Sequence, residues 1–473
     1  MAKKNYNPKS AKSILHYGEA LLGKSLRQLH PEAVLLGGKG GLGKSVEKYH
    51  YGYEPNSEAE PDFVEAGLEL KCTPLKMLRD NSMAAKERLV LNIINYIDEA
   101  RSTFETSSFW RKNKYLLLMF YLHELGTNPV DMLFKMIRDW KFPKEDLKII
   151  NEDWNKIHSK IMEGKAHCLT EGDTFYLSAC MKGSKAKAEL RPQPYSTELA
   201  QQRAYSLKQG YINKIILQSF FDEKLRHQLQ MTPKRIEALK RRYSSEKIVK
   251  STRCYKANET FEQLIERRFE PFYGKTVAQI ERRTHVTLNT KSNDLAYNVC
   301  RAILKIKTRK IHEFENAGIS LKSIVLEANR NKIKESMSFP YIRFVDMVEQ
   351  EWEESEWYKL LSCKFLFTVF RKSEDGDKSK MRLVKVFFWN MPFDDLIIAK
   401  ELWEDTKQKV CNGDYNNFIT TKTHKVCHVR PHGTKNQKVP TPQGQLVQPK
   451  CFWLNNDYIL NVVTSNIVDG SNR

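Results

Sequence analysis

The chain has 473 residues, of which 41% are hydrophobic and 11% aromatic, and this composition excludes a disordered protein. Its formal net charge of +21 favours a polyanionic partner, with nucleic acid ahead of an anionic membrane. We expect no transmembrane helix and no secretory signal, because the apolar runs are too short for either. The nine cysteines are scattered and form no Cys-x-x-Cys pair, which is typical of reduced thiols in a cytoplasmic protein.

Helices and strands alternate along the first half of the chain, and its last part is rich in loops. A hairpin that carries Asp62 and Glu69 is expected between the second helix and the first apolar strand. The pattern predicts an α/β fold of the α+β type with a mixed sheet. The expected helices cover residues 11–28, 43–49 and 144–162, and the expected strands cover 89–94 and 115–122.

The sequence repeats itself at a spacing of about 250 residues, a sign of internal duplication. Four blocks recur in the same order at almost the same offset. We therefore predict two domains of one fold, residues 1–215 and 258–473, joined by a basic helical connector over 216–257. The paired blocks are 22–29 with 273–280, 63–71 with 314–322, 143–154 with 392–403, and 205–212 with 452–459.

Asp62, Glu69 and Lys71 form the motif that points to chemistry. Side chains alternate along a strand, so Glu69 and Lys71 project to one face, with Asp62 a short turn earlier. Two carboxylates beside an ammonium suit the binding of a divalent cation against a phosphate and the activation of a water. A solvated strand is the plainer interpretation. The second copy favours catalysis, because it keeps the fold-setting residues but has Ser320 in place of Glu69.

Other polar residues are candidates for contacts with DNA. Lys86 precedes a buried strand and is either a second positive charge near the scissile phosphate or an ordinary strand-entry lysine. A basic loop contains Lys182, Gly183 and Lys185, and the lysines there suit phosphate or base-edge contacts. Further candidates are Lys208 and Tyr211 in the first half and His428, Arg430, His432, Asn455 and Asn456 in the second.

The glycine-rich segment 38–45 matches the phosphate-binding loop pattern G-x-x-x-x-G-K-S. A nucleotide hydrolase would also need a partner strand that ends in Asp, and the sequence offers no convincing one. A flexible loop before the helix that carries Glu47 is the better interpretation.

The segment 65–74 resembles the active-site hairpin of the MutH family, which comprises a mismatch-repair nicking endonuclease and related restriction enzymes. The longer resemblance is to the Sau3AI-like, GATC-specific type II restriction endonucleases. It is carried by segments 86–96, 104–109 and 203–208 in the first half and by 334–339, 427–432 and 453–458 in the second.

This resemblance implies a duplicated restriction-endonuclease-like fold with a degenerate second copy. Asp62, Glu69 and Glu47 would hold Mg²⁺, Lys71 would position the attacking water, and Lys86 matches a further active-site lysine. The substrate would be double-stranded DNA, cut 5′ of G in GATC. The second copy would bind another GATC site and promote dimerisation on DNA of a chain that is monomeric when free. A cognate methyltransferase would complete the restriction-modification system.

Three other functions remain open at this point. The first is a strand-nicking repair endonuclease, which the duplicated chain disfavours because such an enzyme needs no second copy. The second is a non-catalytic GATC-binding regulator, and the acids that are intact in only one copy argue against it. A phosphate-loop ATPase is the third.

Overall fold

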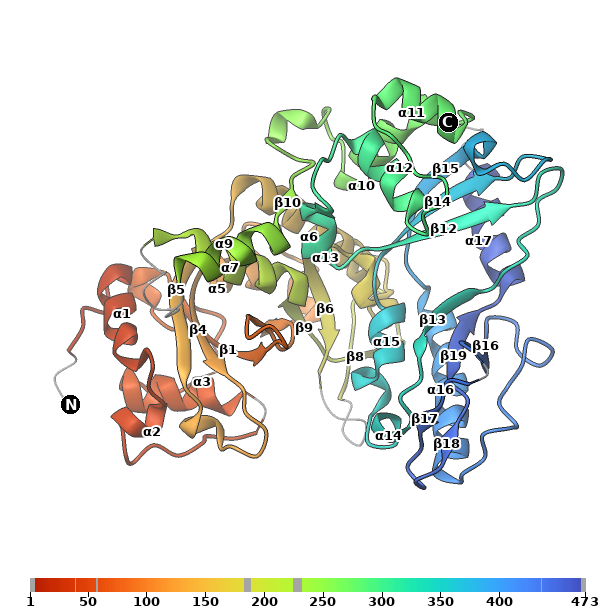
Figure 1. Cartoon of the computed structure of the whole chain (residues 1–473). Coiled ribbons are helices and arrows are strands. Elements are labelled where there is room, and N and C mark those ends of the chain that lie inside the picture. Colours follow the sequence, from red (N-terminus) through yellow and green to blue (C-terminus); the bar gives the residue numbers. More distant parts are fainter. Residues whose placement is uncertain are drawn as a thin grey trace. The chain divides into compact units, whose positions relative to one another are not determined.

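The computed structural model describes residues 5–38, 40–56, 58–182, 189–223, 232–434 and 436–468. The chain forms two compact units (Figure 1). Unit 1 contains residues 1–169, 173–253 and 308–318, and unit 2 contains 170–172, 254–307 and 319–473. In the part of the chain that the structure describes, no helix is long and apolar enough to cross a membrane.

Unit 1 is built around a mixed four-stranded sheet in the order β2-β1-β4-β5. Strand β1 runs parallel to β4, whereas β2 and β5 pair antiparallel with their neighbours. β4 is buried in the middle of the sheet, as its continuous apolar sequence predicts. The bounds are β1 (Glu69–Met77), β2 (Met83–Ala85), β4 (Tyr115–Leu122) and β5 (Phe134–Lys141).

Three short helices pack on this sheet, beside the strands in Figure 1. They are α1 (Ala11–Gly18), α2 (Leu26–Leu29) and α3 (Gly41–Ser45), which continues as a π-helical turn over Val46–His50. The helix expected over 11–28 is broken. Gly23 takes a positive φ of 74°, and Ser25 then starts α2 with a capping box. Apolar side chains of these helices form one core with those of the sheet.

A second, antiparallel sheet of unit 1 has the order β3-β9-β6. The buried carboxyl of Asp153 on α6 accepts backbone N–H groups of Phe175, Tyr176 and Leu177, which ties the helix to the start of β6. The elements are β3 (Leu89–Ile93), α4 (Tyr96–Glu99), α5 (Ser108–Asn113), α6 (Lys144–Met162), β6 (Leu177–Met181), β7 (Leu190–Arg191), β8 (Ala200–Gln201), β9 (Arg203–Leu207), α7 (Gln209–Phe221), α9 (Pro233–Tyr243), β10 (Ser245–Glu246), β11 (Lys310–Ile311) and α13 (His312–Ala317).

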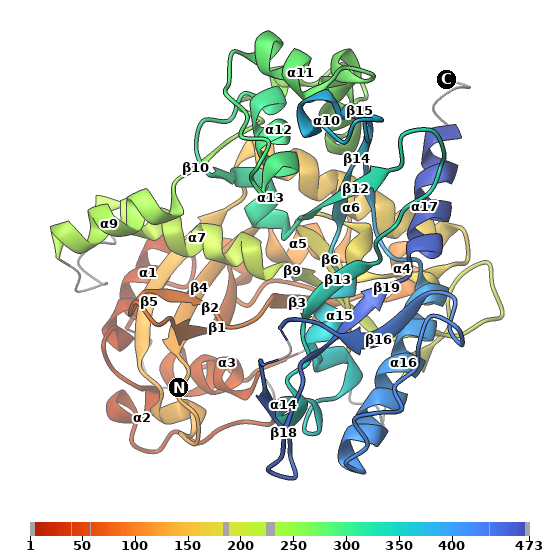
Figure 2. The same cartoon turned by 45° about the vertical axis from the view of Figure 1, so that its right-hand side comes forward.

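Unit 2 repeats this plan. Strands β12 and β14 are parallel, β14 and β15 are antiparallel, and α10, α11 and α12 gather beside them (Figure 2). A second sheet has the order β13-β19-β16. The elements are α10 (Phe261–Phe269), α11 (Val277–Thr284), α12 (Leu295–Leu304), β12 (Ser320–Leu326), β13 (Met337–Tyr341), α14 (Phe344–Met347), α15 (Glu356–Leu361), β14 (Phe365–Arg371), β15 (Arg382–Trp389), α16 (Phe393–Cys411), β16 (Cys427–Pro431), β17 (Val439–Pro440), β18 (Leu446–Val447), β19 (Lys450–Leu454) and α17 (Asn456–Val468).

The two copies share their strand register. Glu69 lies opposite Leu116 in the first copy, and Ser320 lies opposite Phe365 at the corresponding place in the second. Helices α6 and α16 each have 19 residues, and α7 and α17 each have 13. This match lets residues of the two copies be compared position by position.

The compact units do not follow the expected domain boundaries at every point. The connector, expected as a separate segment over 216–257, lies within unit 1 up to residue 253, and unit 1 also takes in 308–318. A specific contact accounts for this. The buried carboxylate of Glu313, which occupies the position of Asp62 in the second copy, accepts the backbone N–H groups of Ile248 and Val249, both at 2.9 Å.

Candidate active site

The start of β1 brings two carboxylates together. A 3-10 turn over Val64–Ala66 and a positive φ of 61° at Gly67 fold the chain back, so that Asp62 lies beside Glu69. The Asp62 N–H donates to Glu69 Oε2 at 3.1 Å, and the Leu70 N–H donates to Asp62 Oδ2 at 2.8 Å. The expected hairpin is therefore a tight turn with a single bridge between Phe63 and Leu68.

Lys71 lies on the same face of β1 as Glu69, as the alternation of a strand predicts. Its Nζ is 2.6 Å from Glu69 Oε1, and Glu69 is 1% exposed. Both side chains of this ion pair are largely removed from solvent, so water screens it little.

Lys112, on α5, is the second cation of the cluster. Its Nζ lies 3.8 Å from Glu69 Oε1 and donates a hydrogen bond of 2.8 Å to the carbonyl of Glu58. Its side chain is 11% exposed. The sequence interpretation missed this residue, because strands β2 and β3 and helix α4 separate Lys112 from the strand that carries Lys71.

Glu47 completes the cluster from the π-helical turn after α3. Burial raises the pKa of Glu47, and the Glu69 charge adds to this, whereas Lys71 and Lys112 oppose it. Burial also raises the pKa of Asp62, to about 8, with the charges of Glu69 and Glu47 as further causes. The buried hydroxyl of Tyr53 has no hydrogen-bond partner among the residues that the structure describes. Burial, followed by the charges of Asp62 and Glu47, raises its pKa well above the ordinary value.

Lys86 lies elsewhere. It is exposed just after β2, and its Nζ contacts His123 Nε2 at 2.9 Å. The second lysine beside Glu69 is thus Lys112, and among the described residues no hydrogen bond or ion pair joins Lys86 to Asp62, Glu69 or Glu47.

The second copy has lost this cluster. The positions of Glu69 and Lys112 hold Ser320 and Leu360, the fifth residue of α15 as Lys112 is of α5. Lys322, at the position of Lys71, instead lies over the ring of Phe339 at 5.1 Å, and burial lowers its pKa. Cys300, at the position of Glu47, is buried against Thr368.

The glycine-rich segment 38–45 does not have the architecture of a phosphate-binding loop. Residues 33–36 before it form no strand. The hydroxyl of Ser45, which such a loop would turn toward a bound nucleotide, is buried, accepts from the Leu36 N–H and donates to the Val34 carbonyl. Gly41–Ser45 of this segment form helix α3, which runs into the turn that carries Glu47, so the expected flexible loop is wrong for these residues.

The DNA-contact residues predicted in the first half differ in burial and in their hydrogen-bond partners. Tyr211 is fully buried and donates to Asp146 Oδ2 at 2.9 Å, so the prediction that it contacts DNA is wrong. Lys208 is half-buried and donates to the carbonyl of Thr174, a structural contact. Lys182 is half-buried at the end of β6, and Gly183 and Lys185 lie outside the described residues.

The candidates in unit 2 also divide. His428 and Asn455 are buried, with His428 Nδ1 at 2.6 Å from Asn455 Oδ1, so the prediction of DNA contacts is wrong for this pair. Asn456 is half-buried and donates to the carbonyl of Ile333. Arg430 and His432 are exposed, with the Arg430 guanidinium 3.8 Å from the ring centroid of Trp453. These two remain a predicted DNA surface.

Comparison with known proteins decides the family. The chain is 33% identical to the type II restriction enzyme Sau3AI of Staphylococcus aureus over 93% of this chain and 95% of that protein. The chain belongs to the family of MutH-type, Sau3AI-like restriction endonucleases. A profile of the family described as DNA mismatch repair enzyme MutH matches residues 51–153 and 304–401, one segment in each copy. The DNA mismatch repair protein MutH of Shewanella woodyi (strain ATCC 51908 / MS32) is 25% identical over 46% of this chain and 94% of that protein.

Membership of this Sau3AI-like family confirms the resemblance, the duplicated mixed α/β fold and the enzyme class expected from the sequence. The first matched segment contains Asp62, Glu69, Lys71 and Lys112, and the second contains their degenerate counterparts. The cluster in unit 1 is therefore the candidate nuclease centre of a restriction endonuclease.

Proposed function

We propose that the chain is a Mg²⁺-dependent endonuclease that recognises GATC in double-stranded DNA and cleaves both strands 5′ of G. The observation that carries this proposal is the buried cluster at the start of β1, where Lys71 and Lys112 both lie within 4 Å of Glu69. GATC, the cleavage position and a cognate methyltransferase rest on the sequence resemblance to the family.

A divalent cation fits the carboxylates of the cluster. Among the described residues, no three His, Cys, Asp or Glu side chains lie close enough to hold a metal ion by themselves. Mg²⁺, however, commonly takes only one or two protein carboxylates and fills its remaining positions with water and substrate phosphate. Asp62 and Glu69 supply such oxygens, and a cation between them would offset the burial and the carboxylate repulsion that raise the pKa of Asp62. When bound, the ion would polarise the scissile phosphate and lower the pKa of a water.

The remaining groups have roles that follow from their charge and placement. The Lys71 ammonium, held by Glu69, would orient the attacking water and stabilise the charge that develops on the phosphate. Lys112 would supply a second positive charge from the α5 side. Glu47, whose pKa is raised, would hold a proton or complete the acidic cluster when the cation is bound.

One competent centre for each chain has a consequence for assembly. A single centre cannot cut both strands of a palindrome in one event, so two chains should assemble on one duplex while the positive charge keeps free chains apart at low salt. Unit 2, through Arg430 and His432, would bind a second GATC site and support this assembly. Sedimentation of the metal-free complex should show two chains on one GATC duplex, and one chain for each duplex would contradict the proposal.

The proposed specificity is tested by incubating supercoiled plasmids with the protein and Mg²⁺. Plasmids with GATC should become linear, and a plasmid from which every GATC has been removed should stay supercoiled. Product that stops at the open-circle form would favour the strand-nicking repair endonuclease. GATC binding without cleavage in any divalent metal would favour the non-catalytic regulator.

A further inference from the structure

The first residue of α5 is held by a buried carboxyl group. Glu99, the last residue of α4, is 1% exposed. Its Oε1 accepts hydrogen bonds from Trp154 Nε1 at 2.7 Å and from the Tyr205 hydroxyl at 2.8 Å, and its Oε2 accepts one from the Ser108 hydroxyl at 2.9 Å. Burial and the Glu99 carboxyl raise the pKa of Tyr205 well above its ordinary value, so this hydroxyl stays protonated and donates.

The other end of α5 is tied into the same network. Asn92 on β3 donates from Nδ2 to Ser108 Oγ at 3.1 Å, and Asn113 donates from its Nδ2 to Asn92 Oδ1 at 2.8 Å. Ser108 and Lys112 are four residues apart and share a face of the helix. The network therefore brackets the segment of backbone that carries Lys112.

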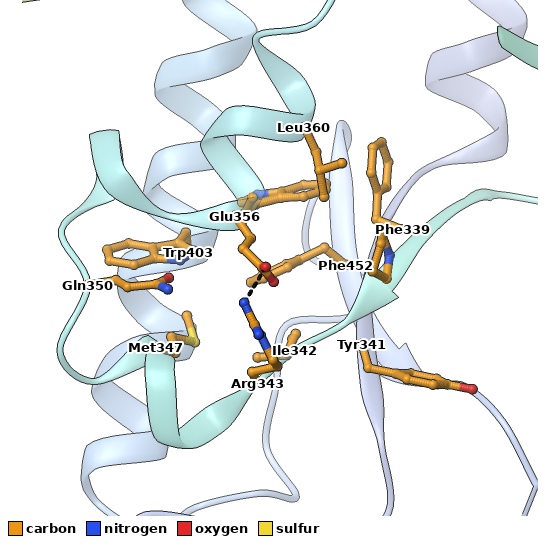
Figure 3. Close-up of a pocket in the computed structure, with 12 residues that line it drawn as sticks. Phe339, Tyr341, Ile342, Arg343, Met347, Gln350, Glu356, Leu360, Trp403 and Phe452 are labelled. Carbon is orange, nitrogen blue, oxygen red and sulfur yellow. Dashed lines mark hydrogen bonds and ion pairs between the residues drawn. The ribbon is translucent and has the colours of Figure 1, made fainter. Parts of the chain in front are cut away.

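The second copy shows that this network is not needed for the fold. Every member of the network except the tryptophan is replaced there, although the helices and strands that carry it remain. Only the tryptophan persists, as Trp403. Figure 3 shows Met347, at the position of Glu99, below Trp403, and Glu356, at the position of Ser108, paired with Arg343. The other replacements are Phe452 for Tyr205, Pro340 for Asn92, Leu361 for Asn113 and Leu360 for Lys112.

A neighbouring pair behaves in the opposite way and provides an internal control. The Tyr211 hydroxyl donates to Asp146 in the first copy, and the Tyr458 hydroxyl donates to Asp395 at the same places in the second, at 2.7 Å. A contact that serves the fold has thus been kept in both copies, whereas the network around Glu99 has been lost together with the catalytic residues.

We propose that Glu99 is a positioning residue that, through the Ser108 hydroxyl, fixes α5 so that the Lys112 ammonium stays beside Glu69. The inference rests on the proposed catalytic role of Lys112. The 3.8 Å between Lys112 Nζ and Glu69 Oε1 is too long for a hydrogen bond, so the helix and the Glu58 carbonyl set the position of the ammonium. Misplacement of a catalytic group by about 1 Å can reduce a rate by about 100-fold.

The test uses the full-length protein and a GATC duplex, with Ser108→Ala as the variant that cuts the connection. Alanine suits the first helical position and Ser107 remains the N-cap, so the fold should persist. We expect the single-turnover cleavage rate to fall about tenfold, with the Kd for the duplex in divalent-free buffer unchanged. Ser108→Thr, which keeps the hydroxyl, should restore the rate. Tyr211→Phe removes the hydrogen bond to Asp146 that both copies keep, and it should leave the rate unchanged.

A double-mutant cycle separates this inference from the role of Lys112 itself. In a Lys112→Leu protein, Ser108→Ala should have no further effect on the rate, because both changes act through one group. Full activity of Ser108→Ala, or an equal loss with and without Lys112, would overturn the positioning role. Full activity of Lys112→Leu alone would instead overturn the catalytic role of Lys112. A thermal melt of each variant checks the fold, and Glu99→Gln replaces Ser108→Ala if the latter melts early.

Discussion

Replacing Glu69 with glutamine should reduce the rate of DNA cleavage by about 1,000-fold or more, the scale expected when a charge that stabilises the transition state is removed. Glutamine keeps the shape of the side chain and an oxygen that can accept from the Asp62 N–H, so the start of β1 should remain folded. It removes the charge that holds Lys71 at 2.6 Å and one of the two carboxylates available to a divalent cation. The measurement is single-turnover cleavage of a GATC duplex with saturating Mg²⁺.

DNA binding by Glu69→Gln provides the control. The substitution removes a negative charge from a strongly basic protein, so affinity for the duplex in divalent-free buffer should stay the same or increase. Loss of binding together with cleavage would show that Glu69 serves the fold or the DNA interface instead of the chemistry.

Replacing Lys112 with leucine should reduce cleavage by about 100-fold, because it removes one of the two cations beside Glu69. Leucine is the residue that the second copy carries at this position, as Leu360, and the helix there is intact. The matched control is Lys86→Ala. Lys86 is exposed and contacts His123, so its removal should change the rate by no more than about twofold.

The comparison of these two lysines discriminates between the structure and the sequence interpretation. A large loss with Lys86→Ala and a small one with Lys112→Leu would restore Lys86 as the active-site lysine. Both variants should bind the duplex with an affinity close to that of the original protein, since each loses a single positive charge of many.

The strands and long helices of this fold could be predicted from sequence because their signals are local. The apolar run over Tyr115–Leu122 and the helical spacing over Lys144–Met162 appear as β4 and α6 with the expected bounds. The prediction of one helix over residues 11–28 was wrong, because Gly23 adopts a left-handed conformation that periodicity alone does not reveal. The internal repeat predicted the duplication, and the shared register of β1–β4 and β12–β14 confirms it.

The active site was predictable only where its residues are close in sequence. Asp62, Glu69 and Lys71 lie in one short segment, whereas Lys112 reaches them through the parallel pairing of β1 with β4, which brings α5 to the same edge. The signal that could have found it was present. The second copy has Leu360 at the position of Lys112, whereas the positions of Ser107 and Phe109 hold the similar residues Ser355 and Trp357.

Polar sequence alone did not distinguish surface from core in the proposed DNA contacts. Tyr211 and His428 are polar residues near the ends of strands and helices, a common place for binding residues, yet both satisfy hydrogen bonds inside the protein. Their partners Asp146 and Asn455 lie 65 and 27 residues away, so only the folded chain shows why these side chains are buried.

The central claim is that the first copy cuts DNA and the second does not. The most direct test is a single-turnover cleavage assay of two variants at the position where the copies differ. Glu69→Ser gives the first copy the residue of the second, and Ser320→Ala changes the matching residue of the second copy. The first variant should lose about 1,000-fold in rate and the second should cleave as the original protein does. Undiminished cleavage by Glu69→Ser, or its loss in Ser320→Ala, would contradict the assignment of catalysis to the cluster at Asp62, Glu69 and Lys71.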